Sequence, residues 1–288
     1  MSSDALFVPP IDFLAVGHIC RDVAPDGWMM GGAAAYGGLT AHALGCRVGV
    51  VTSGAAEDDW AAALPEVAVQ QIASAATTVF ENLYTDTGRV QSVHSVAGRI
   101  GANHVPLLWT RAPMVLLGPI ANEIDPDLIG RFSNSLIGVG PQGWLRRWDE
   151  RGRVYAVTWD AAAAVLPLAA VTFVSEEDLV DAGMLDDYRR LAGTLVLTQG
   201  ARGCTVFCHG EARTFAAPTV AVADLTGAGD IFAAAYLVRF HQTDGNPWAA
   251  AEFANRIAAK AVTRRGLPAK TAVVRQLVTE QMHSSAGW

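Results

Sequence analysis

The sequence predicts an α/β protein with a doubly wound, mostly parallel sheet, and three observations lead to this fold class. Buried strand patterns alternate with helical patterns along most of the 288 residues. The first elements follow the order strand, helix, strand, which forms a parallel crossover in proteins. Hydrophobic residues make up 51% of the chain and charged residues only 17%, as expected for a globular domain with a large core.

The N-terminal crossover is predicted from three segments. Residues 11–20, IDFLAVGHIC, predict a buried strand that ends in a glycine turn. Residues 31–45, GGAAAYGGLTAHALG, predict a helix that begins after two glycines and ends at Gly45, a residue type common just past a helix. Residues 46–54, CRVGVVTSG, predict the second buried strand.

Residues 77–97 predict a β-hairpin inserted into this α/β pattern. The segments TTVFENLYTD and GRVQSVHSVA both alternate polar and apolar residues, and the turn-forming residues DTG at 86–88 join them. We expect a small antiparallel flap.

The second half of the chain returns to the α/β pattern. Strands are predicted at 112–118, 135–140, 170–175 and 193–200, followed by an antiparallel pair at 203–210 and 211–217. Helices are predicted at 125–134, from 176, from Asp230 and over 246–266. No repeat or linker divides the chain, so we expect one domain over residues 1–288, with the 77–97 hairpin as an insertion.

Charge and composition exclude several classes of protein. A net charge of −7 argues against sequence-independent binding of nucleic acid, which requires a basic surface. The longest apolar run, residues 161–174, is too short to span a membrane. The first ten residues lack the basic region and apolar core of a signal peptide. Four scattered cysteines indicate free thiols, and we expect a cytoplasmic protein.

We compared the sequence with two common nucleotide-binding motifs, the dinucleotide-binding glycine turn and the Walker A loop. GVGPQG at 138–143 matches G-x-G-x-x-G, with Asp160 about twenty residues on, but Pro141 falls inside the glycine turn. A dehydrogenase that uses this segment remains an alternative. A Walker A loop is excluded, because neither Lys260 nor Lys270, the only lysines, follows a glycine.

The segment DLTGAGD, residues 224–230, carries the strongest chemical signal. Glycines before a helix expose backbone N–H groups at the positive end of the helix dipole, where an anion can bind. Asp230 would then stand beside that anion. Phosphoryl transfer requires this pairing of amides and a base, although a capped helix start remains a second explanation.

This segment resembles the second signature of the ribokinase-like (PfkB) carbohydrate kinases, D-T-x-G-A-G-D-x-F. The helix at 31–45 resembles the first signature, TQGARG at 198–203 resembles the nucleotide loop, and FANRIAAKAVTRRGLPA resembles the helix that closes over adenine. The resemblance spans residues 11–270. It implies a Rossmann-like sheet, a β-sheet lid over the sugar, and ATP-dependent transfer of the γ-phosphoryl group to an alcohol.

The resemblance also implies roles for individual residues. Asp230 is the general base, and Gly227, Ala228 and Gly229 form the anion hole. The other residues that match family positions bind nucleotide (Thr198, Gly200, Gly203, Thr226, Asn255), acceptor (Asp22, Gly31, Gly32) or a monovalent cation such as K⁺ (Asp224, Thr226).

The chain departs from the family pattern at three places. The N-x-x-E motif that organises Mg²⁺ reads Ser175-Glu176-Glu177-Asp178 here, which leaves Asp178 as the metal carboxylate; a Ser-capped acidic turn explains the same residues. Tyr36 replaces an asparagine that binds sugar hydroxyls. Only VAPDGWMM separates Asp22 from Gly31, so we expect a reduced lid that consists of the 77–97 hairpin alone.

The expected function is an ATP-dependent kinase of a sugar or polyol. The hairpin sequence is similar to members that act on inositol-like polyols, and with Tyr36 this places a cyclitol such as myo-inositol among the leading acceptors, beside sugars such as ribose or fructose. Arg89 on the hairpin is a further candidate for acceptor binding. The alternatives are a nucleoside kinase of the same family and a non-catalytic ligand-binding protein on the kinase fold. We expect a monomer or homodimer without nucleic-acid or membrane partners.

Overall fold

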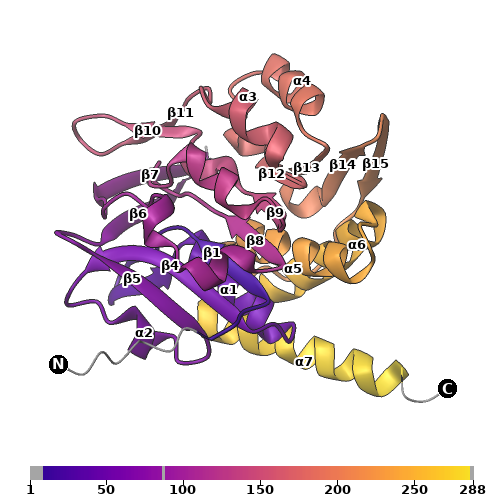
Figure 1. The fold of residues 1–288 in the computed structure, drawn as a ribbon, viewed down its shortest axis with the longest axis horizontal. Coiled ribbons are helices and arrows are strands. Elements are labelled where there is room, and N and C mark those ends of the chain that lie inside the picture. Colours follow the sequence, from indigo (N-terminus) through magenta and orange to yellow (C-terminus); the bar gives the residue numbers. More distant parts are fainter. Residues whose placement is uncertain (1–8, 86–87, 286–288) are drawn as a thin grey trace.

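A nine-stranded sheet forms the centre of the molecule (Figure 1). The computed structural model describes residues 9–85 and 88–285. In spatial order the strands are β15 (Glu211–Phe215), β14 (Cys204–Cys208), β13 (Thr194–Thr198), β12 (Val171–Ser175), β9 (Leu136–Val139), β8 (Met114–Leu117), β1 (Phe13–Val16), β4 (Val48–Ala55) and β5 (Ala68–Ser74). Neighbouring strands from β13 to β5 are parallel, and the β13–β14–β15 end is antiparallel. The predicted mixed, mostly parallel sheet is confirmed.

Helices cover both faces of this sheet. One face carries α1 (Ala33–Ala43), α5 (Ala228–Gln242) and α6 (Pro247–Ala261), with α7 (Leu267–Ser285) packed against α1 and α6. Figure 1 shows α3 (Ala162–Val165) and α4 (Ala182–Leu191) at the upper side, away from α5, α6 and α7. The short α2 (Trp60–Ala63) packs against β5. The 3₁₀ segments are Ala102–His104, Leu107–Arg111, Pro126–Phe132, Pro141–Gly143, Leu166–Leu168, Glu176–Asp178 and Gly200–Arg202.

The strands are apolar on both sides because both faces are covered. Along β1, Phe13 and Ala15 join the core under α1 and α5, whereas Leu14 and Val16 join the core on the opposite face. The buried strand patterns of the sequence follow from this two-sided packing.

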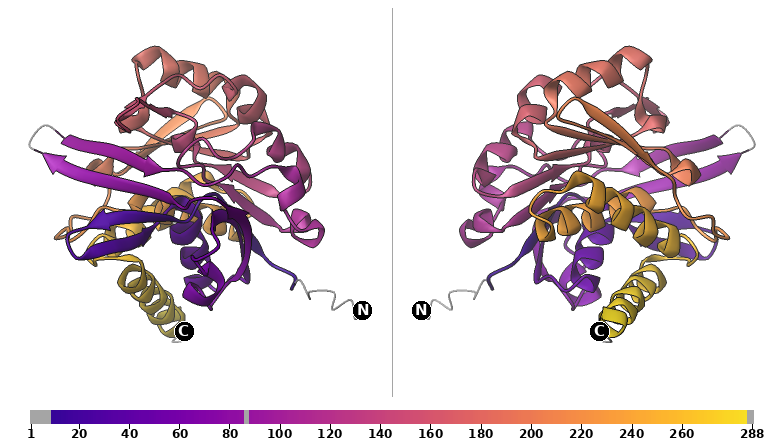
Figure 2. Two further views of the ribbon diagram at one scale, coloured as in Figure 1. Left: turned by 90° about the vertical axis from the view of Figure 1, so that its left-hand side faces the viewer. Right: turned by 90° about the vertical axis from the view of Figure 1, so that its right-hand side faces the viewer.

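A second, four-stranded sheet stands at the carboxyl end of β1, and it corrects the predicted lid. Its order is β3 (Gly27–Gly31), β2 (Cys20–Ala24), β6 (Thr78–Thr85) and β7 (Gly88–Ser95). The β6–β7 hairpin is confirmed, but the expectation that the lid consists of this hairpin alone was wrong. Residues 20–31 form a hairpin of their own, and its β2 strand pairs in parallel with β6. Figure 2 shows both hairpins projecting from the same side of the main sheet.

Two smaller expectations also change. The strand expected in residues 11–20 does end at a glycine, because β1 stops at Val16 before Gly17 with φ +152°, but Cys20 already begins β2. Pro141–Gly143 forms a single 3₁₀ turn after β9, and β10 (Arg146–Trp148) then pairs with β11 (Val154–Ala156). The GVGPQG segment therefore does not open a helix, as a dinucleotide-binding turn would.

A buried carboxylate joins the loops that follow β1 and β8. Glu123 is 1% exposed and accepts hydrogen bonds from the backbone N–H groups of His18, Ile120 and Ala121, at 2.7 to 3.0 Å. Hydrogen bonds to a charged acceptor are stronger than neutral ones. Glu123 therefore fixes the backbone where the main sheet gives way to the small one.

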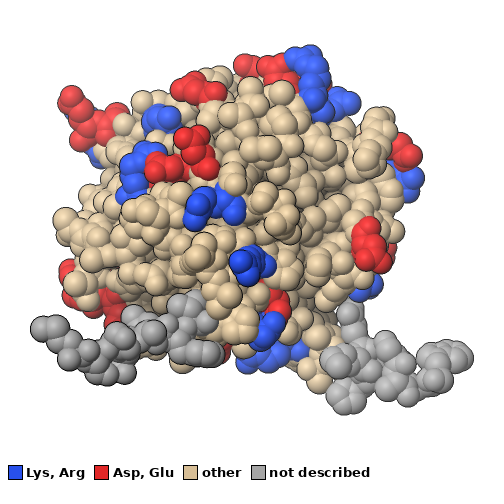
Figure 3. Space-filling model, viewed as in Figure 1, with Lys and Arg blue, Asp and Glu red and all other residues tan. Residues whose placement is uncertain are grey.

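Three further observations concern the surface, the helices and the cysteines. On the face seen in Figure 3, basic and acidic side chains are interspersed in small groups. Among the described residues, none of the helices combines the length and apolar character needed to cross a membrane. All four cysteines are free, as expected.

Candidate active site

The turn before α5 has the geometry that the DLTGAGD segment predicts. Gly227 adopts a left-handed conformation, with φ +73°, and α5 begins at the next residue. Asp230 lies in the first turn of the helix and is half-buried. The first N–H groups of a helix have no partner four residues earlier and form the positive end of its dipole. The turn therefore presents backbone donors and a carboxylate side by side.

One of the three predicted anion-hole amides is used within the turn. The N–H of Ala228 donates to the carbonyl oxygen of Leu225 at 3.1 Å. A proposal for anion binding therefore rests on the amides of Gly227 and Gly229.

Tyr36 of α1 lies directly beneath Gly227. A Cβ atom at residue 227 would overlap the Tyr36 ring, and Tyr36 is only 2% exposed. Residue 227 must therefore be a glycine for two reasons, the positive φ and the close approach of the Tyr36 ring. The structure gives Tyr36 the role of supporting the turn, and its expected contact with an acceptor stays a prediction.

Asp22, which is predicted to bind the acceptor, belongs to the small sheet. It lies on β2, is 9% exposed, and pairs in register with Met29 of β3. A Cβ atom at Gly31 would overlap the Asp22 carboxylate, and one at Gly32, with φ +98°, would overlap the His18 carbonyl. The two glycines thus allow the β2–β3 hairpin to close tightly beside the start of α1.

Three carboxylates lie near enough to Tyr36 to affect the pKa of its hydroxyl. Burial raises the pKa of the Tyr36 hydroxyl, and the charges of Asp224, Asp22 and Asp230 raise it further. Burial also raises the pKa of the Cys20 thiol, with Asp22 and Asp230 adding to the shift. Asp22 of the small sheet and Asp230 of α5 therefore share one neighbourhood, although more than 200 residues separate them in sequence. Such a group of acidic side chains at the carboxyl ends of parallel strands is typical of an α/β active site.

The predicted nucleotide loop lies farther along the same edge of the sheet. Thr198 ends β13 and is in register with Ser175, which ends β12. Gly200 and Gly203 have positive φ values, and a Cβ atom at Gly203 would overlap the Phe215 carbonyl. The loop and the Ser175–Asp178 segment are joined by an ion pair between Arg202 and Glu176.

Asp178 is engaged by a residue that the sequence did not single out. Its carboxylate is paired with Arg146 of β10 at 3.4 Å, and both side chains are nearly buried. In this arrangement Asp178 does not fit the role of a metal ligand. Ser175 caps the 3₁₀ turn by accepting the N–H of Glu177, as the capped-turn explanation expects. In the parts of the chain that the structure describes, no three His, Cys, Asp or Glu side chains gather as a metal site.

Asp224 likewise has both carboxylate oxygens engaged by groups of the protein, which does not support the expected K⁺ ligand. One oxygen accepts the N–H of Thr226 at 2.9 Å. The other accepts the N–H of Gly266 at 3.2 Å and lies 3.0 Å from the ammonium of Lys270. Burial opposes ionisation of Asp224, but the hydrogen bonds from Thr226, Gly266 and Lys270 outweigh it and lower its pKa.

Two further predicted site residues are Asn255 and Arg89. The structure shows the contacts of Asn255 but only the strand position of Arg89. Asn255 of α6 is 5% exposed, and its amide donates to the Phe215 carbonyl at 3.0 Å and faces the Cys204 sulfur at 3.5 Å. Arg89 lies on β7 opposite Tyr84, but its side chain is outside the described part of the structure.

Sequence reasoning missed Lys270, Arg146 and Glu123. Lys270 appeared in the sequence only as evidence against a Walker loop. Its signal was available, because a lone lysine precedes the apolar run TAVV in a helical segment. Arg146 carries no comparable local signal, since its partner Asp178 lies 32 residues away, and the hydrogen bond between Glu123 and His18 spans 105 residues.

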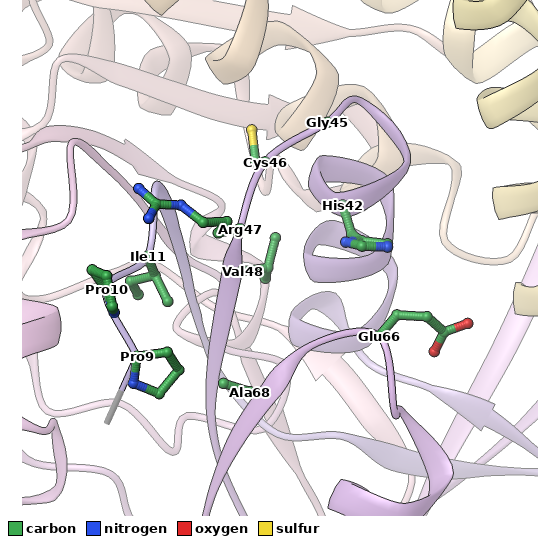
Figure 4. Close-up of a pocket in the computed structure, with 10 residues that line it drawn as sticks. All are labelled: Pro9, Pro10, Ile11, His42, Gly45, Cys46, Arg47, Val48, Glu66 and Ala68. Atoms are coloured by element: carbon green, nitrogen blue, oxygen red, sulfur yellow. The ribbon is translucent and has the colours of Figure 1, made fainter. Parts of the chain in front are cut away.

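The pocket drawn in Figure 4 is separate from the residues around Tyr36. It is lined by residues such as Ile11, Val48 and Ala68, which stand where β1, β4 and β5 begin. In parallel α/β sheets, ligands bind at the opposite edge, beyond the carboxyl ends of the strands. The carboxylate cluster around Tyr36 is therefore the candidate active site, and this pocket is not.

Comparison with known proteins shows which kinases the chain is similar to. A model described as pfkB family carbohydrate kinase matches residues 154–271. The chain is 28% identical over 287 residues to inositol 3-kinase of Oryza sativa subsp. japonica, which covers 90% of this chain and 70% of the relative.

Two solved structures illustrate the shared fold. A pyrophosphate-dependent kinase of the ribokinase family, complexed with a pyrophosphate analogue and myo-inositol, superposes with a TM-score of 0.77 at 22% identity, covering 91% of this chain and 98% of the other. A putative ribokinase II from E. coli, in complex with ATP and Mg²⁺, has a TM-score of 0.68 at 16% identity and covers 93% and 99% of the two chains.

The fold, the carboxylate cluster and these similarities define a phosphotransferase that acts on a sugar or polyol. The family model over residues 154–271 and the shared fold make the chain similar to the ribokinase-like (PfkB) carbohydrate kinases.

The contact between Gly227 and Tyr36 can be tested by a single substitution. Gly227→Ala introduces a Cβ atom into the Tyr36 ring at a positive φ, and we expect it to lower the free energy of unfolding by about 1–3 kcal/mol. Urea denaturation followed by circular dichroism measures this change.

Gly229→Ala is the matched control, because nothing lies within 4 Å of a Cβ atom there and the residue is helical. Its unfolding free energy should stay the same or rise by up to about 1 kcal/mol. Equal stabilities of the two variants would contradict the role of the contact.

Proposed function

We propose that the protein is an ATP-dependent kinase that transfers the γ-phosphoryl group to a hydroxyl of a polyol, with a cyclitol such as myo-inositol as the leading acceptor. The observation that carries the proposal is the approach of Asp230, at the start of α5, to Asp22 of the small sheet around Tyr36. One carboxylate is placed beside backbone donors, and the other lies where a polyol would be held.

In this mechanism Asp230 accepts the proton of the attacking hydroxyl. The amides of Gly227 and Gly229, at the positive end of α5, stabilise the charge on the moving phosphoryl group. Asp22 accepts hydrogen bonds from further hydroxyls of the acceptor and so fixes which oxygen faces Asp230. Asp230 and the amides thus act on opposite ends of the same transfer, as phosphoryl transfer requires.

The choice of acceptor rests on the relatives and on the small sheet. The curated relative is an inositol 3-kinase, and a solved neighbour binds myo-inositol. A cyclitol presents hydroxyls around its ring, which suits an acceptor side built from a carboxylate and tightly packed glycines. Ribose, fructose and nucleosides are the other acceptors to be compared.

The donor site in the proposal is formed by Thr198, Gly200 and Gly203, at and beyond the end of β13, together with Thr226 in the turn before α5. These loops provide backbone groups and a hydroxyl for the donor phosphates. The proposal includes Mg²⁺ as the partner of those phosphates, on the general chemistry of kinases, and assigns it no protein ligand.

Pyrophosphate is the second candidate for the donor. The amide of Asn255, which was expected near an adenine, is buried and hydrogen-bonded to the Phe215 carbonyl. A donor without a base would need no contact from this residue. A solved neighbour of the same fold uses pyrophosphate, whereas another binds ATP.

An acceptor and donor panel tests the proposal. The protein is incubated with Mg²⁺ and either ATP or pyrophosphate, in the presence of myo-inositol, ribose, fructose or adenosine, and phosphorus NMR follows the products. We expect a myo-inositol phosphate from ATP. Faster transfer from pyrophosphate would favour the second donor. Calorimetric binding of an acceptor and ATP without any transfer would contradict the proposal and favour a ligand-binding protein.

Asp230→Asn tests the base. The variant keeps the size of the side chain but cannot accept the proton, so we expect kcat to fall by roughly 10²–10⁴-fold with little change in ATP affinity. Asp244→Asn is the control, because Asp244 is exposed past the other end of α5 and has φ +49°, which asparagine also tolerates. Equal turnover of both variants would exclude Asp230 as the base.

A further inference from the structure

Lys270 is a buried lysine whose ammonium is surrounded by oxygen atoms of the turn before α5. Its side chain is 0% exposed. The Nζ atom lies 2.8 Å from the carbonyl oxygen of Asp224, 2.6 Å from that of Thr226 and 3.0 Å from a carboxylate oxygen of Asp224. Three acceptors match the three N–H donors of a protonated lysine.

The position of this ammonium connects it to the candidate active site. Thr226 directly precedes Gly227, the residue that caps α5. The ammonium also lies 5.8 Å from the centre of the Tyr36 ring, the ring that supports Gly227. Lys270 thus holds the turn from one side while Tyr36 of α1 holds it from the other.

The ammonium also affects the charge balance of the site. Asp22, Asp224 and Asp230 all lie close enough to Tyr36 to raise the pKa of its hydroxyl. A buried positive charge among these carboxylates offsets part of their repulsion of an anionic donor. Burial lowers the pKa of Lys270, and the hydrogen bond and charge of Asp224 oppose that shift.

The oxygen atoms around Nζ are of the kind that binds an alkali cation. A carboxylate and two carbonyl oxygens form a hard, anionic donor set, and an ammonium group resembles K⁺ in charge and size. The covalently attached ammonium fills the place that a free cation would take between Asp224 and Thr226.

We propose that Lys270 is a positioning residue that serves as a built-in monovalent cation, so that the Asp224–Asp230 turn is ordered without K⁺ or any other free cation. The effect on turnover rests on the proposed kinase function. The effect on stability does not, because the ammonium bonds to the turn whether or not a substrate binds.

The first test uses the unchanged protein. Its turnover and its melting temperature are measured in equal concentrations of KCl, NaCl and tetramethylammonium chloride. We expect the same values in all three salts. Activation or stabilisation by K⁺ over tetramethylammonium would overturn the proposal without any variant.

The second test removes the ammonium with Lys270→Ala. In tetramethylammonium chloride we expect kcat/KM to fall by roughly 10- to 100-fold, the scale seen when a group that orients a site is lost. K⁺, NH₄⁺ or propylammonium should restore much of the activity and raise the melting temperature, because each can enter the vacated oxygen site. A purely structural lysine would give a variant that none of these cations rescues selectively, and that result overturns the proposal.

Lys260→Ala is the matched control. Lys260 is the only other lysine and is exposed on α6, so its removal should change neither the activity nor the salt dependence.

If Lys270→Ala does not fold, Lys270→Met keeps the apolar stem and leaves the oxygens without a cation. Full stability and activity of that variant in tetramethylammonium would also overturn the proposal. If no acceptor is phosphorylated by the wild type, the cation-dependent melting of Lys270→Ala still decides the question.

Discussion

The contact of Gly227 with the ring of Tyr36 is the constraint on which the candidate site depends. It joins α1, from the first crossover of the fold, to α5, from its last third, at the point where α5 begins. Only a glycine permits both the positive φ and this close approach. The contact sets the distance between the turn and α1, and therefore the position of Asp230 relative to Asp22 on the small sheet. Glu123 fixes the backbone of the loops that follow β1 and β8, so the surroundings of the site are held by more than one contact.

Most of the fold could be predicted because the main sheet is buried on both faces. Its strands appear as apolar runs, and α1 and α5 begin at glycines that are visible in the sequence. The β2–β3 hairpin was missed although Pro25 and Asp26 before Gly27 are typical turn residues. The family comparison suggested that residues 23–30 were too few for lid strands. A two-residue turn needs very little chain, and pairing with β6 supplies the support that an isolated hairpin lacks.

The site was predictable where its residues are close in sequence and unpredictable where they meet across the fold. The turn from Asp224 to Asp230 is local, and its geometry follows from the glycines. The pairing of Asp178 with Arg146 and of Asp224 with Lys270 depends on elements that only the folded chain brings together. Both pairings engage carboxylates that sequence reasoning assigned to metal ions. The sequence shows which residues can ionise, but the charge that neutralises each one is a property of packing.

A crystal structure with a non-hydrolysable donor analogue and myo-inositol would test the central claim most directly. We expect one hydroxyl of the acceptor to lie within hydrogen-bond reach of Asp230, about 2.6–3.2 Å. We also expect the terminal phosphoryl group to lie against the amides of Gly227 and Gly229, with Asp22 on other hydroxyls. An acceptor bound with no hydroxyl near Asp230, or a donor phosphate far from the turn, would contradict the account.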